Sequence, residues 1–427
     1  MKKVLIITYY WPPAGGPGVQ RWLKFSKYLR DFGIDPIIYT PENPNFPIQD
    51  ESLLNEVPVG ITVIKKPIFE PYFFAKLFSK KQTSKISSGI IEEANKQGML
   101  QKLFLYIRGN FFIPDARKFW VKSSVKFLKQ YLLENAIDTI ITTGPPHSLH
   151  LIGLELKKTL PIKWMTDFRD PWTEIGYHKK LKLSASAKTK HIKLETEVLT
   201  SADQIITTSF KTKEEFSRKT SKPIRVITNG FDSELSENVL LDSKFTLSHI
   251  GSLLSERNPE NLWKVLKEIN TENEDFAHDL QLNLVGTVSQ AVVNSIKAYD
   301  LEDNLMLKGY VTHKEANHLQ RSSQVLLLIE IDSEETKGII PGKLFEYLAA
   351  KRPIIAIGPK DWDVNGILKE TSSGNYFTYK DHDNLKSKIL TSYLEYKLDN
   401  LKIDSHNIEK YSRRNLTQDL ANLLKAE

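Results

Sequence analysis

The feature that most constrains this chain is a repeated order of short apolar run, glycine-containing loop and amphipathic helix. The chain opens with an apolar run at 3–8, a Gly/Pro loop at 12–18, a helical pattern over 19–32 and a second apolar run at 34–40. The order returns later, where the run 245–250 is followed by a glycine. Alternating runs and helices of this kind are typical of parallel sheets covered by helices. The sequence therefore predicts a doubly wound α/β fold.

The length of the chain predicts two domains. With 427 residues it is too long for one typical domain and fits two of about 200 residues. A polar stretch at 233–244 separates the two alternating halves and is the expected linker. We therefore expect an N-terminal domain over 1–240 and a C-terminal domain over 241–404, with a final helix over 405–425.

Charge is distributed unevenly between the two halves. The chain has a formal net charge of +7, with 36 basic and 24 acidic residues in 1–240 but 23 basic and 28 acidic residues in 241–427. A basic half is expected to meet nucleic acid, anionic lipid or an acidic substrate. No cysteine is present, which excludes disulfides and thiolate chemistry. We expect a cytoplasmic protein, because the apolar run near the start is too short for a signal-peptide core and no apolar window reaches the length of a membrane span.

The segment 70–120 is both aromatic and basic, and two interpretations of it stay open. It contains Phe-rich stretches interleaved with lysines. Such a composition suits a helix lying on an anionic membrane surface, on the inner face of the cell membrane. It equally suits a buried helical insertion with a solvated basic face.

A turn followed by a short helix, Gly338–Ala350, carries the strongest chemical signal. Pro341 and Gly342 end the preceding structure, and the pattern predicts a helix over Lys343–Ala350. Lys343 is a cation in a first turn, where the helix dipole favours anions, and a phosphate ligand would reconcile the two. Glu346, one turn later, could accept hydrogen bonds from a diol. The alternative is a local surface pair between Lys343 and Glu346.

A second cation precedes a second helix in the same half. Arg257 lies in the loop after Gly251, just before a helical pattern that has Pro259 at its start and runs over 260–270. Arginine can bind phosphate through two parallel hydrogen bonds, whereas lysine acts as a point charge. Two cations at two helix starts fit a diphosphate.

Three loops of the first half follow predicted strands. The loop Gly15–Gly18 would let its backbone approach a ligand, but its glycines lack the G-x-G-x-x-G spacing, so we expect no nicotinamide or flavin. His147 stands at the tip of the strand-end loop Thr142–His147. In the third loop, Asp167–Trp172, we expect Arg169 to pair with Asp167 or Asp170. Each loop also has a purely structural interpretation: an ordinary turn, a structural histidine and a salt-bridged corner.

Taken in order, these motifs resemble glycosyltransferase family 4. The resemblance covers nearly the whole chain and rests on the spacing of several pieces: Gly15-Gly16, Gly144–His147, Asp167–Asp170, Ser201–Asp203, Asn229–Asp232, His249–Ser252 through Arg257, Gly309–Val311 and Lys343–Ala350. It implies the GT-B architecture, in which two Rossmann-like domains face each other across a cleft. It also implies that the final helix, residues 405–427, rejoins the N-terminal domain.

The resemblance further implies a role for individual residues. A nucleoside diphosphate sugar would bind mainly to the C-terminal domain, with Arg257 and Lys343 on the diphosphate and Glu346 on the ribose. Other donor-binding positions are expected at Gly15, Gly16, Gly251, Ser252, Tyr310, Val311, Gly342 and Leu344. His147 would lie near the transferred sugar, and Arg169 and Asp170 on the acceptor side. Two positions depart from the family pattern: Gly338 replaces the first glutamate of its E-x7-E motif, and Ser252 replaces an arginine.

The expected activity is transfer of a sugar to an acceptor hydroxyl with retention of configuration, in the synthesis of a cell-surface polysaccharide or glycolipid. No metal or other cofactor is expected. The acceptor would be an oligosaccharide or lipid-linked sugar, and the basic half could meet an anionic membrane. Three alternatives remain: a GT-B sugar-nucleotide epimerase, a catalytically silent sugar-nucleotide-binding protein, and a nucleic-acid binder, for which no recognition motif is present.

Overall fold

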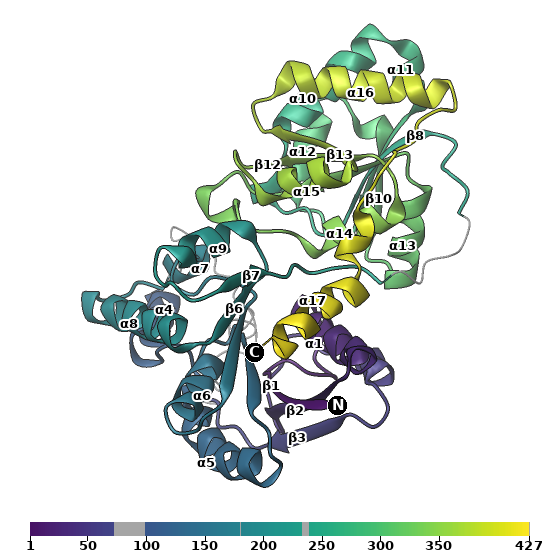
Figure 1. The fold of residues 1–427 in the computed structure, drawn as a ribbon. Helices are drawn as coiled ribbons and strands as arrows, with labels where there is room; N and C mark the ends of the chain where they lie inside the picture. Colours follow the sequence, from purple (N-terminus) through teal and green to yellow (C-terminus); the bar gives the residue numbers. More distant parts are fainter. Residues whose placement is uncertain (72–98, 180, 233–238, 427) are drawn as a thin grey trace. The chain divides into compact units, whose positions relative to one another are not determined.

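The chain folds into two compact units, each built on one parallel sheet (Figure 1). The structure is a computed structural model that describes residues 1–71, 99–179, 181–232 and 239–426. Unit 1 comprises Met1–Thr228 with Arg414–Glu427, and unit 2 comprises Asn229–Arg413. The sequence had suggested 240 and 405 for the two boundaries.

Unit 1 contains a seven-stranded parallel sheet in the order β3-β2-β1-β4-β5-β6-β7. Its strand order reverses between β1 and β4, as in doubly wound folds, where ligands bind beyond the carboxyl ends of the strands. The strands are β1 Lys2–Ile7, β2 Ile34–Pro41, β3 Thr62–Lys66, β4 Thr139–Gly144, β5 Lys163–Phe168, β6 Gln204–Thr207 and β7 Ile224–Val226.

Helices cover both faces of this sheet. Successive residues of β1 point to opposite faces, so Leu5 and Ile7 join one buried cluster while Val4 and Ile6 join another. The described helices are α1 Pro17–Tyr28, α4 Met99–Phe111, α5 Lys118–Glu134, α6 Ser148–Lys157, α7 Gly176–Lys179, α8 Ala185–Ser201, α9 Phe210–Ser217 and α17 Arg413–Lys425, with 3-10 turns η1 Leu29–Phe32 and η2 Glu51–Glu56.

Unit 2 repeats the design with a six-stranded parallel sheet in the order β10-β9-β8-β11-β12-β13. The order reverses between β8 and β11. The strands are β8 Phe245–Ile250, β9 Leu280–Val285, β10 Leu305–Gly309, β11 Val325–Ile329, β12 Ile354–Gly358 and β13 Gly374–Thr378. The helices are α10 Glu260–Glu272, α11 Glu274–Asp279, α12 Gln290–Ala298, α13 His313–Ser322, α14 Gly342–Ala350, α15 Asp363–Thr371 and α16 His382–Lys397, with 3-10 turns η4 Ser255–Arg257, η5 Glu302–Asn304, η6 Glu334–Thr336 and η7 Ile408–Tyr411.

The prediction of a helix over 405–425 is wrong in its first part. The helix begins at Arg413, and Asn407 has a left-handed backbone with φ 56°, which ends any helix there. Ile408 and Tyr411 instead form a 3-10 turn that packs with α14 in unit 2. The remaining helix, α17, lies beside α1 in unit 1 (Figure 1). Leu420 of α17 is fully buried in the same cluster as Trp22 of α1.

The segment 70–120 lies partly outside the described residues. Its described part includes α4 and the start of α5, with exposed Phe111 and Phe119 and the ammonium of Lys118 near the Phe119 ring. No helix among the described residues has the length and apolar character to cross a bilayer. Docking of this segment on a membrane surface stays a prediction.

Candidate functional site

In unit 2, the helix predicted after Gly338 is present as α14. It begins at Gly342, directly after Pro341. Leu344, Tyr347 and Leu348 are buried in the core beneath it, as their spacing predicts. The helix therefore presents Lys343 and Glu346, both half-buried, away from that apolar stripe.

Lys343 lies against the glycine that ends β8. A Cβ atom at Gly251 would stand 2.5 Å from Lys343 Nζ, and Gly251 has φ 130°, so only glycine fits. The neighbouring loops meet there too, since Gly286 donates to the Gly309 carbonyl over 2.6 Å and packs on the Gly251 backbone. The carboxyl ends of β8, β9 and β10 therefore converge beside the lysine, where open parallel sheets bind ligands.

His249 places a lone pair beside Lys343. Its Nδ1 lies 3.0 Å from the carbonyl oxygen of Leu327, which can only accept, so Nδ1 carries the proton. Its Nε2, 3.2 Å from Lys343 Nζ, therefore accepts from the ammonium group. Burial, with Lys343 beside it, lowers the pKa of His249 well below its ordinary value. The histidine is a neutral support for the cation.

Arg257 is held by a carboxylate. It lies in η4, and its Nε and Nη2 atoms are each 2.9 Å from Oε1 of Glu330. Glu330 directly follows β11 and is 2% exposed. The sequence predicted Arg257 at a diphosphate but not its pairing with Glu330, so the structure adds an acidic residue to the pair of cations.

The charge state of Lys343 reflects all these neighbours. Burial and then Arg257 lower its pKa, while Glu330 and Glu346 raise it, and the net result is a pKa of about 8. An ammonium group with a pKa this close to neutrality is easily deprotonated. A bound anion would favour its charged form, so the site suits an anionic ligand.

Glu346 does not pair with Lys343. Its Oε2 accepts from Nε2 of Gln320, on α13, over 2.9 Å, while Lys343 contacts His249. The local lysine–glutamate surface pair, the alternative raised by the sequence, is therefore not formed.

The other donor-binding positions of unit 2 differ in their surroundings. Tyr310, which follows β10, is 93% exposed, and Val311 packs partly on the core. Ser252 and Gly342 are exposed. Leu344 is fully buried, and its backbone N–H donates to the Pro341 carbonyl. Contacts to a ligand at this position would therefore come from the neighbouring residues.

In unit 1, the partner of Asp167 is not the one expected. The carboxylate accepts from the guanidinium of Arg21, with Nη2 2.8 Å from Oδ1, and also from Trp22 Nε1 and the Thr143 hydroxyl, each over 2.8 Å. Burial alone would raise the pKa of Asp167. Arg21 and Thr143 outweigh the effect of burial and hold this pKa below its ordinary value. The expected pairing of Arg169 with Asp167 is corrected to Arg21, because α1 delivers the closer guanidinium.

Arg169 instead joins the three predicted loops. It donates to the carbonyl of Pro145 in the loop after β4, and its guanidinium lies over the Tyr10 ring. A Cβ atom at Gly18 would stand 2.0 Å from Nη1, so the guanidinium packs directly on the glycine backbone. The sequence-predicted loops of unit 1 are therefore brought together around one cation.

The remaining predicted residues of unit 1, Gly15, Gly16 and Asp170, lie in the same loops. Burial raises the pKa of Asp170, against the effect of Arg169. Gly15 donates its N–H to the Ile48 carbonyl over 3.0 Å, and Gly16 precedes α1 with φ 94°.

His147 lies in the loop after β4, as expected, and its side chain is buried. Only 5% exposed, it stacks on Trp172 with ring centroids 5.0 Å apart. Neither ring nitrogen meets a hydrogen-bonding partner in the described part of the chain. Burial, together with nearby His150, lowers its pKa well below the ordinary value, so the imidazole is neutral.

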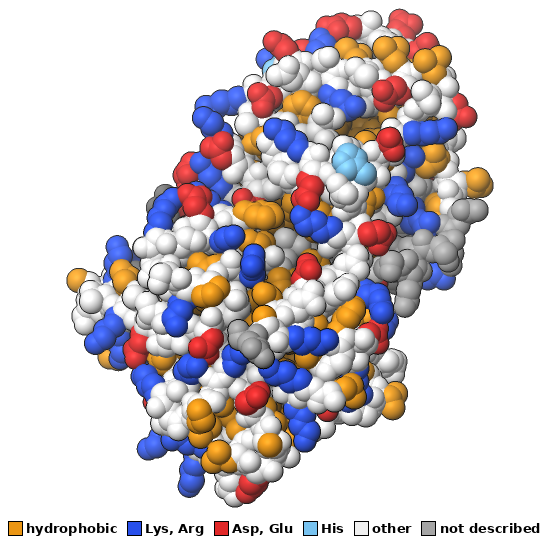
Figure 2. Space-filling view, in the orientation of Figure 1, with side chains coloured by type: hydrophobic (Ala, Val, Ile, Leu, Met, Phe, Trp, Pro, Cys, Tyr) orange, Lys and Arg blue, Asp and Glu red, His pale blue; other side chains and the backbone are white. Residues whose placement is uncertain are grey.

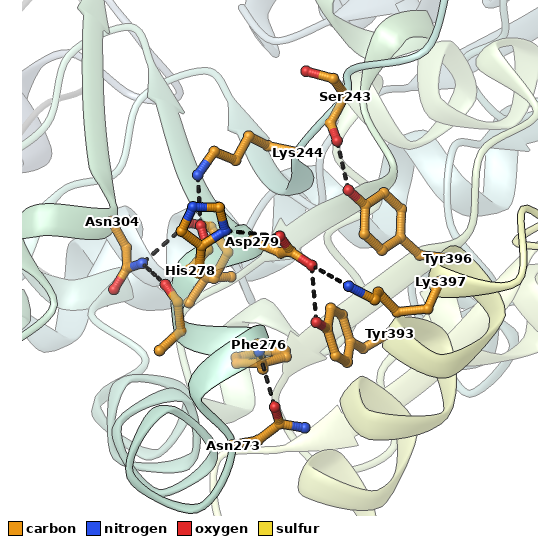
Figure 3. Close-up of polar contacts among 12 residues, drawn as sticks. Ser243, Lys244, Asn273, Phe276, His278, Asp279, Asn304, Tyr393, Tyr396 and Lys397 are labelled. Carbon is orange, nitrogen blue, oxygen red and sulfur yellow. Dashed lines mark hydrogen bonds and ion pairs between the residues drawn. The ribbon is translucent and has the colours of Figure 1, made fainter.

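A third polar cluster, around Asp279, lies at the opposite edge of the unit 2 sheet. Asp279 immediately precedes β9, hence the amino edge, and Tyr393 and Lys397 both reach it from α16 (Figure 3). His278 adds a third contact over 3.1 Å. All these groups are satisfied internally, so we interpret the cluster as structural.

No individual role was predicted from the sequence for four contributors: Arg21, His249, Gln320 and Glu330. Two of them left a signal, since His249 continues the alternate positions of β8 that hold apolar Phe245 and Leu247, and Glu330 follows the wholly apolar run of β11. A polar residue at such a place needs a partner when it is buried. Arg21 and Gln320 lie on helices, where the sequence carries no comparable signal.

Comparisons with known proteins establish the fold. Neither the known protein families nor the curated proteins include a match to this chain. Among solved structures, HepE from Anabaena, crystallised with UDP and glucose, is 13% identical with a TM-score of 0.61, covering 100% of both chains. A sucrose-phosphate synthase from Thermosynechococcus elongatus is 14% identical, with a TM-score of 0.56 over 99% of this chain and 97% of its own.

A putative UDP-N-acetylglucosamine 2-epimerase from Listeria monocytogenes is also similar, at 12% identity and a TM-score of 0.54 over 100% of this chain and 96% of its own. At these identities the likeness shows the fold alone. The chain has the GT-B fold, with two Rossmann-like units, as the resemblance implied.

Proposed function

We propose that this protein is a glycosyltransferase whose unit 2 binds a nucleoside diphosphate sugar. The observation that carries the proposal is that two cations stand at the carboxyl ends of the neighbouring strands β8 and β11: Lys343 lies against Gly251, which follows β8, and Arg257 pairs with Glu330, which follows β11. Small loops allow a phosphate to approach the backbone, and the two cations supply the charge that a diphosphate needs. The solved complex of HepE with UDP and glucose supports a uridine nucleotide as the first ligand to test.

The proposed reaction transfers the sugar to an acceptor hydroxyl with retention of configuration. The bond between the anomeric carbon and the diphosphate oxygen breaks, and the acceptor oxygen forms a bond to that carbon. The acceptor proton leaves with the departing diphosphate. Because negative charge grows on the diphosphate as it leaves, Lys343 and Arg257 stabilise the transition state more than the bound substrate.

Two further roles follow from the surroundings. Glu346, fixed by Gln320, would accept hydrogen bonds from the ribose hydroxyls. Arg169 and Asp170, in unit 1, would meet the acceptor, which we propose to be an oligosaccharide or lipid-linked sugar destined for a surface polysaccharide or glycolipid. Buried His147 would support the acceptor loops through its stacking on Trp172.

The test is turnover of a panel of nucleotide sugars with and without sugar acceptors. We expect nucleotide release that depends on an acceptor, and a loss of about 100-fold or more in kcat/KM for Lys343→Met. Lys386→Met is the matched control, because Lys386 pairs with Glu268 and Glu272 on the surface of unit 2. A normal rate in Lys343→Met would contradict the site assignment.

The same assay separates the other candidates. An epimerase, favoured by the similarity to the Listeria protein, would convert the sugar nucleotide with no acceptor present. A silent binding protein would bind without turnover. A nucleic-acid binder is disfavoured by the surface, because Lys and Arg side chains on the face shown in Figure 2 are spread among other types rather than gathered in one patch.

We propose that the two cations make a metal ion unnecessary for the reaction. Treatment with a chelator followed by assay in metal-free buffer should leave kcat within about twofold, since the diphosphate charge is met by side chains. A loss restored by Mg²⁺ or Mn²⁺ would show that a metal shares this role.

A further inference from the structure

Glu330 is a buried acid that the proposed reaction does not itself use. It is 2% exposed and directly follows the apolar strand β11, whose five residues are all buried. Removing a carboxylate from water is costly unless it is paired and hydrogen-bonded. Its position at the carboxyl edge of the sheet therefore needs a reason.

Three donors converge on one oxygen of Glu330. Nε and Nη2 of Arg257 and the backbone N–H of Ile331 each lie 2.9 Å from Oε1. Two contacts from one planar guanidinium fix its orientation as well as its place. Arg257 lies on the short turn η4, which has no buried residue to anchor it. The carboxylate is thus the principal contact that orients this arginine.

We propose that Glu330 is a positioning residue of the diphosphate site: it orients Arg257 at the end of β11, next to the end of β8 where Lys343 lies against Gly251, and its negative charge offsets the two cations. This inference rests on the proposed function, because a diphosphate is the ligand that two adjacent cations would serve. Glu330 itself does not touch the substrate.

The charges around Lys343 support this role. Arg257 disfavours the ammonium form of Lys343, while Glu330 and Glu346 favour it, and His249 beside it is neutral. Of the two acids, Glu330 also contacts Arg257 directly. Without Glu330, burial and Arg257 would lower the pKa of Lys343 further, and Arg257 would lose the contact that orients it. Both cations would then bind an anion less well.

A conservative substitution separates this role from a purely structural one. Glu330→Gln keeps the shape and one acceptor oxygen but removes the charge. The backbone at this point has an independent support, since the hydroxyl of Tyr379 donates to the Glu330 carbonyl over 2.9 Å. Glu370→Gln is the matched control, a carboxylate of the same unit that pairs with Lys410.

The first measurement needs no ligand. Carbon-13 NMR of labelled lysine side chains gives the titration midpoint of Lys343, assigned with Lys343→Met. We expect Glu330→Gln to lower this midpoint by about one pH unit and Glu370→Gln to leave it in place. An unchanged midpoint in Glu330→Gln would overturn the electrostatic part of the proposal.

The second measurement is the affinity for UDP at pH 7. Glu330→Gln should weaken binding about tenfold in the wild-type background, but less than about threefold in an Arg257→Ala background, because the arginine to be oriented is gone. Equal losses in both backgrounds would overturn the positioning role. If the wild type binds no UDP, the proposed function fails, while the Lys343 midpoint still decides the effect of Glu330.

A further variant keeps the test decisive if Glu330→Gln does not fold. Arg257→Ala removes the opposing cation, so the Lys343 midpoint should rise by about one pH unit. A midpoint that stays in place would show that the two cations are not coupled and would overturn the proposal.

Discussion

At the scale of single residues, the proposed diphosphate site of unit 2 depends on whether Lys343 is charged. Its pKa is lowered to about 8, chiefly by burial and then by Arg257. The ammonium form therefore predominates below pH 8 and disappears above it. Because an anionic ligand needs that form, binding and protonation are linked.

This linkage predicts a pH-dependent affinity for UDP. The dissociation constant should be nearly constant below pH 8 and should increase, approaching tenfold per pH unit, above it. Equilibrium dialysis between pH 6.5 and 9.5 measures it. Lys343→Met provides the control, because any remaining pH dependence in that variant comes from the nucleotide. A wild-type curve with the same slope as the variant would contradict the assignment.

At the scale of elements, the amino-acid pattern predicted the strands and helices well and some partners poorly. The α14 helix followed from its apolar spacing, and the loops after β1, β4 and β5 followed from glycine and proline. Which side chains pair within the loops depends on tertiary placement. Thus Arg169 was expected to pair with Asp167 or Asp170, whereas α1 brings Arg21 to Asp167.

The same limit applies to the chain end and to the buried acid. The apolar residues of 405–425 fit one helix, but the sequence did not show that Asn407 is left-handed or that Tyr411 packs in the other unit. Glu330 could not be assigned a role, because its partner Arg257 is distant in sequence and meets it only after β8 and β11 pair.

The Asp167 network predicts a large stability effect. Asp167→Asn removes the charge paired with Arg21, leaving a buried guanidinium uncompensated. We expect the free energy of unfolding to fall by about 3–5 kcal/mol. Unfolding in urea, followed by the fluorescence of unit 1, measures this change in free energy. Glu155→Gln, which breaks an exposed pair with Lys158, should cost less than about 1 kcal/mol. Similar small losses in both variants would contradict the account of this corner.

The Asp279 cluster predicts a contribution to stability that depends on pH. Burial opposes ionisation, but hydrogen bonds from Lys397, His278 and Tyr393 lower the pKa of Asp279 from 3.8 to about 2. A depressed carboxyl pKa contributes stability that is complete above the unfolded value and lost as the pH falls through 2. Asp279→Asn should therefore lower the melting temperature by a few degrees at pH 7, about 1 kcal/mol, and by less at pH 3. An equal difference at both pH values would contradict this.

At the scale of the whole molecule, the chain leaves unit 1, forms unit 2 and returns. The return is α17, whose Leu416, Leu420 and Leu424 are buried in a cluster with residues of α1 and β1. Unit 1 is therefore completed only by the last residues of the chain, and its stability depends on them.

This connectivity predicts a local effect from a distant mutation. Leu420→Ala should destabilise unit 1 by about 2–5 kcal/mol through lost burial and a cavity, while unit 2 keeps its transition. Differential scanning calorimetry resolves the two changes. Asn422→Ala, on the exposed side of the same helix, is the control and should lie near the wild type. A shift of the unit 2 transition alone would contradict the division of the chain.

The central claim is that Lys343 and Arg257 in unit 2 bind the diphosphate of a sugar nucleotide. The most direct test is isothermal titration calorimetry of the full chain with UDP at pH 7. We predict saturable binding that Lys343→Met weakens about 10- to 100-fold, with Lys386→Met unchanged. Absence of binding to UDP and to other nucleoside diphosphates, or equal affinity in wild type and Lys343→Met, would contradict the claim.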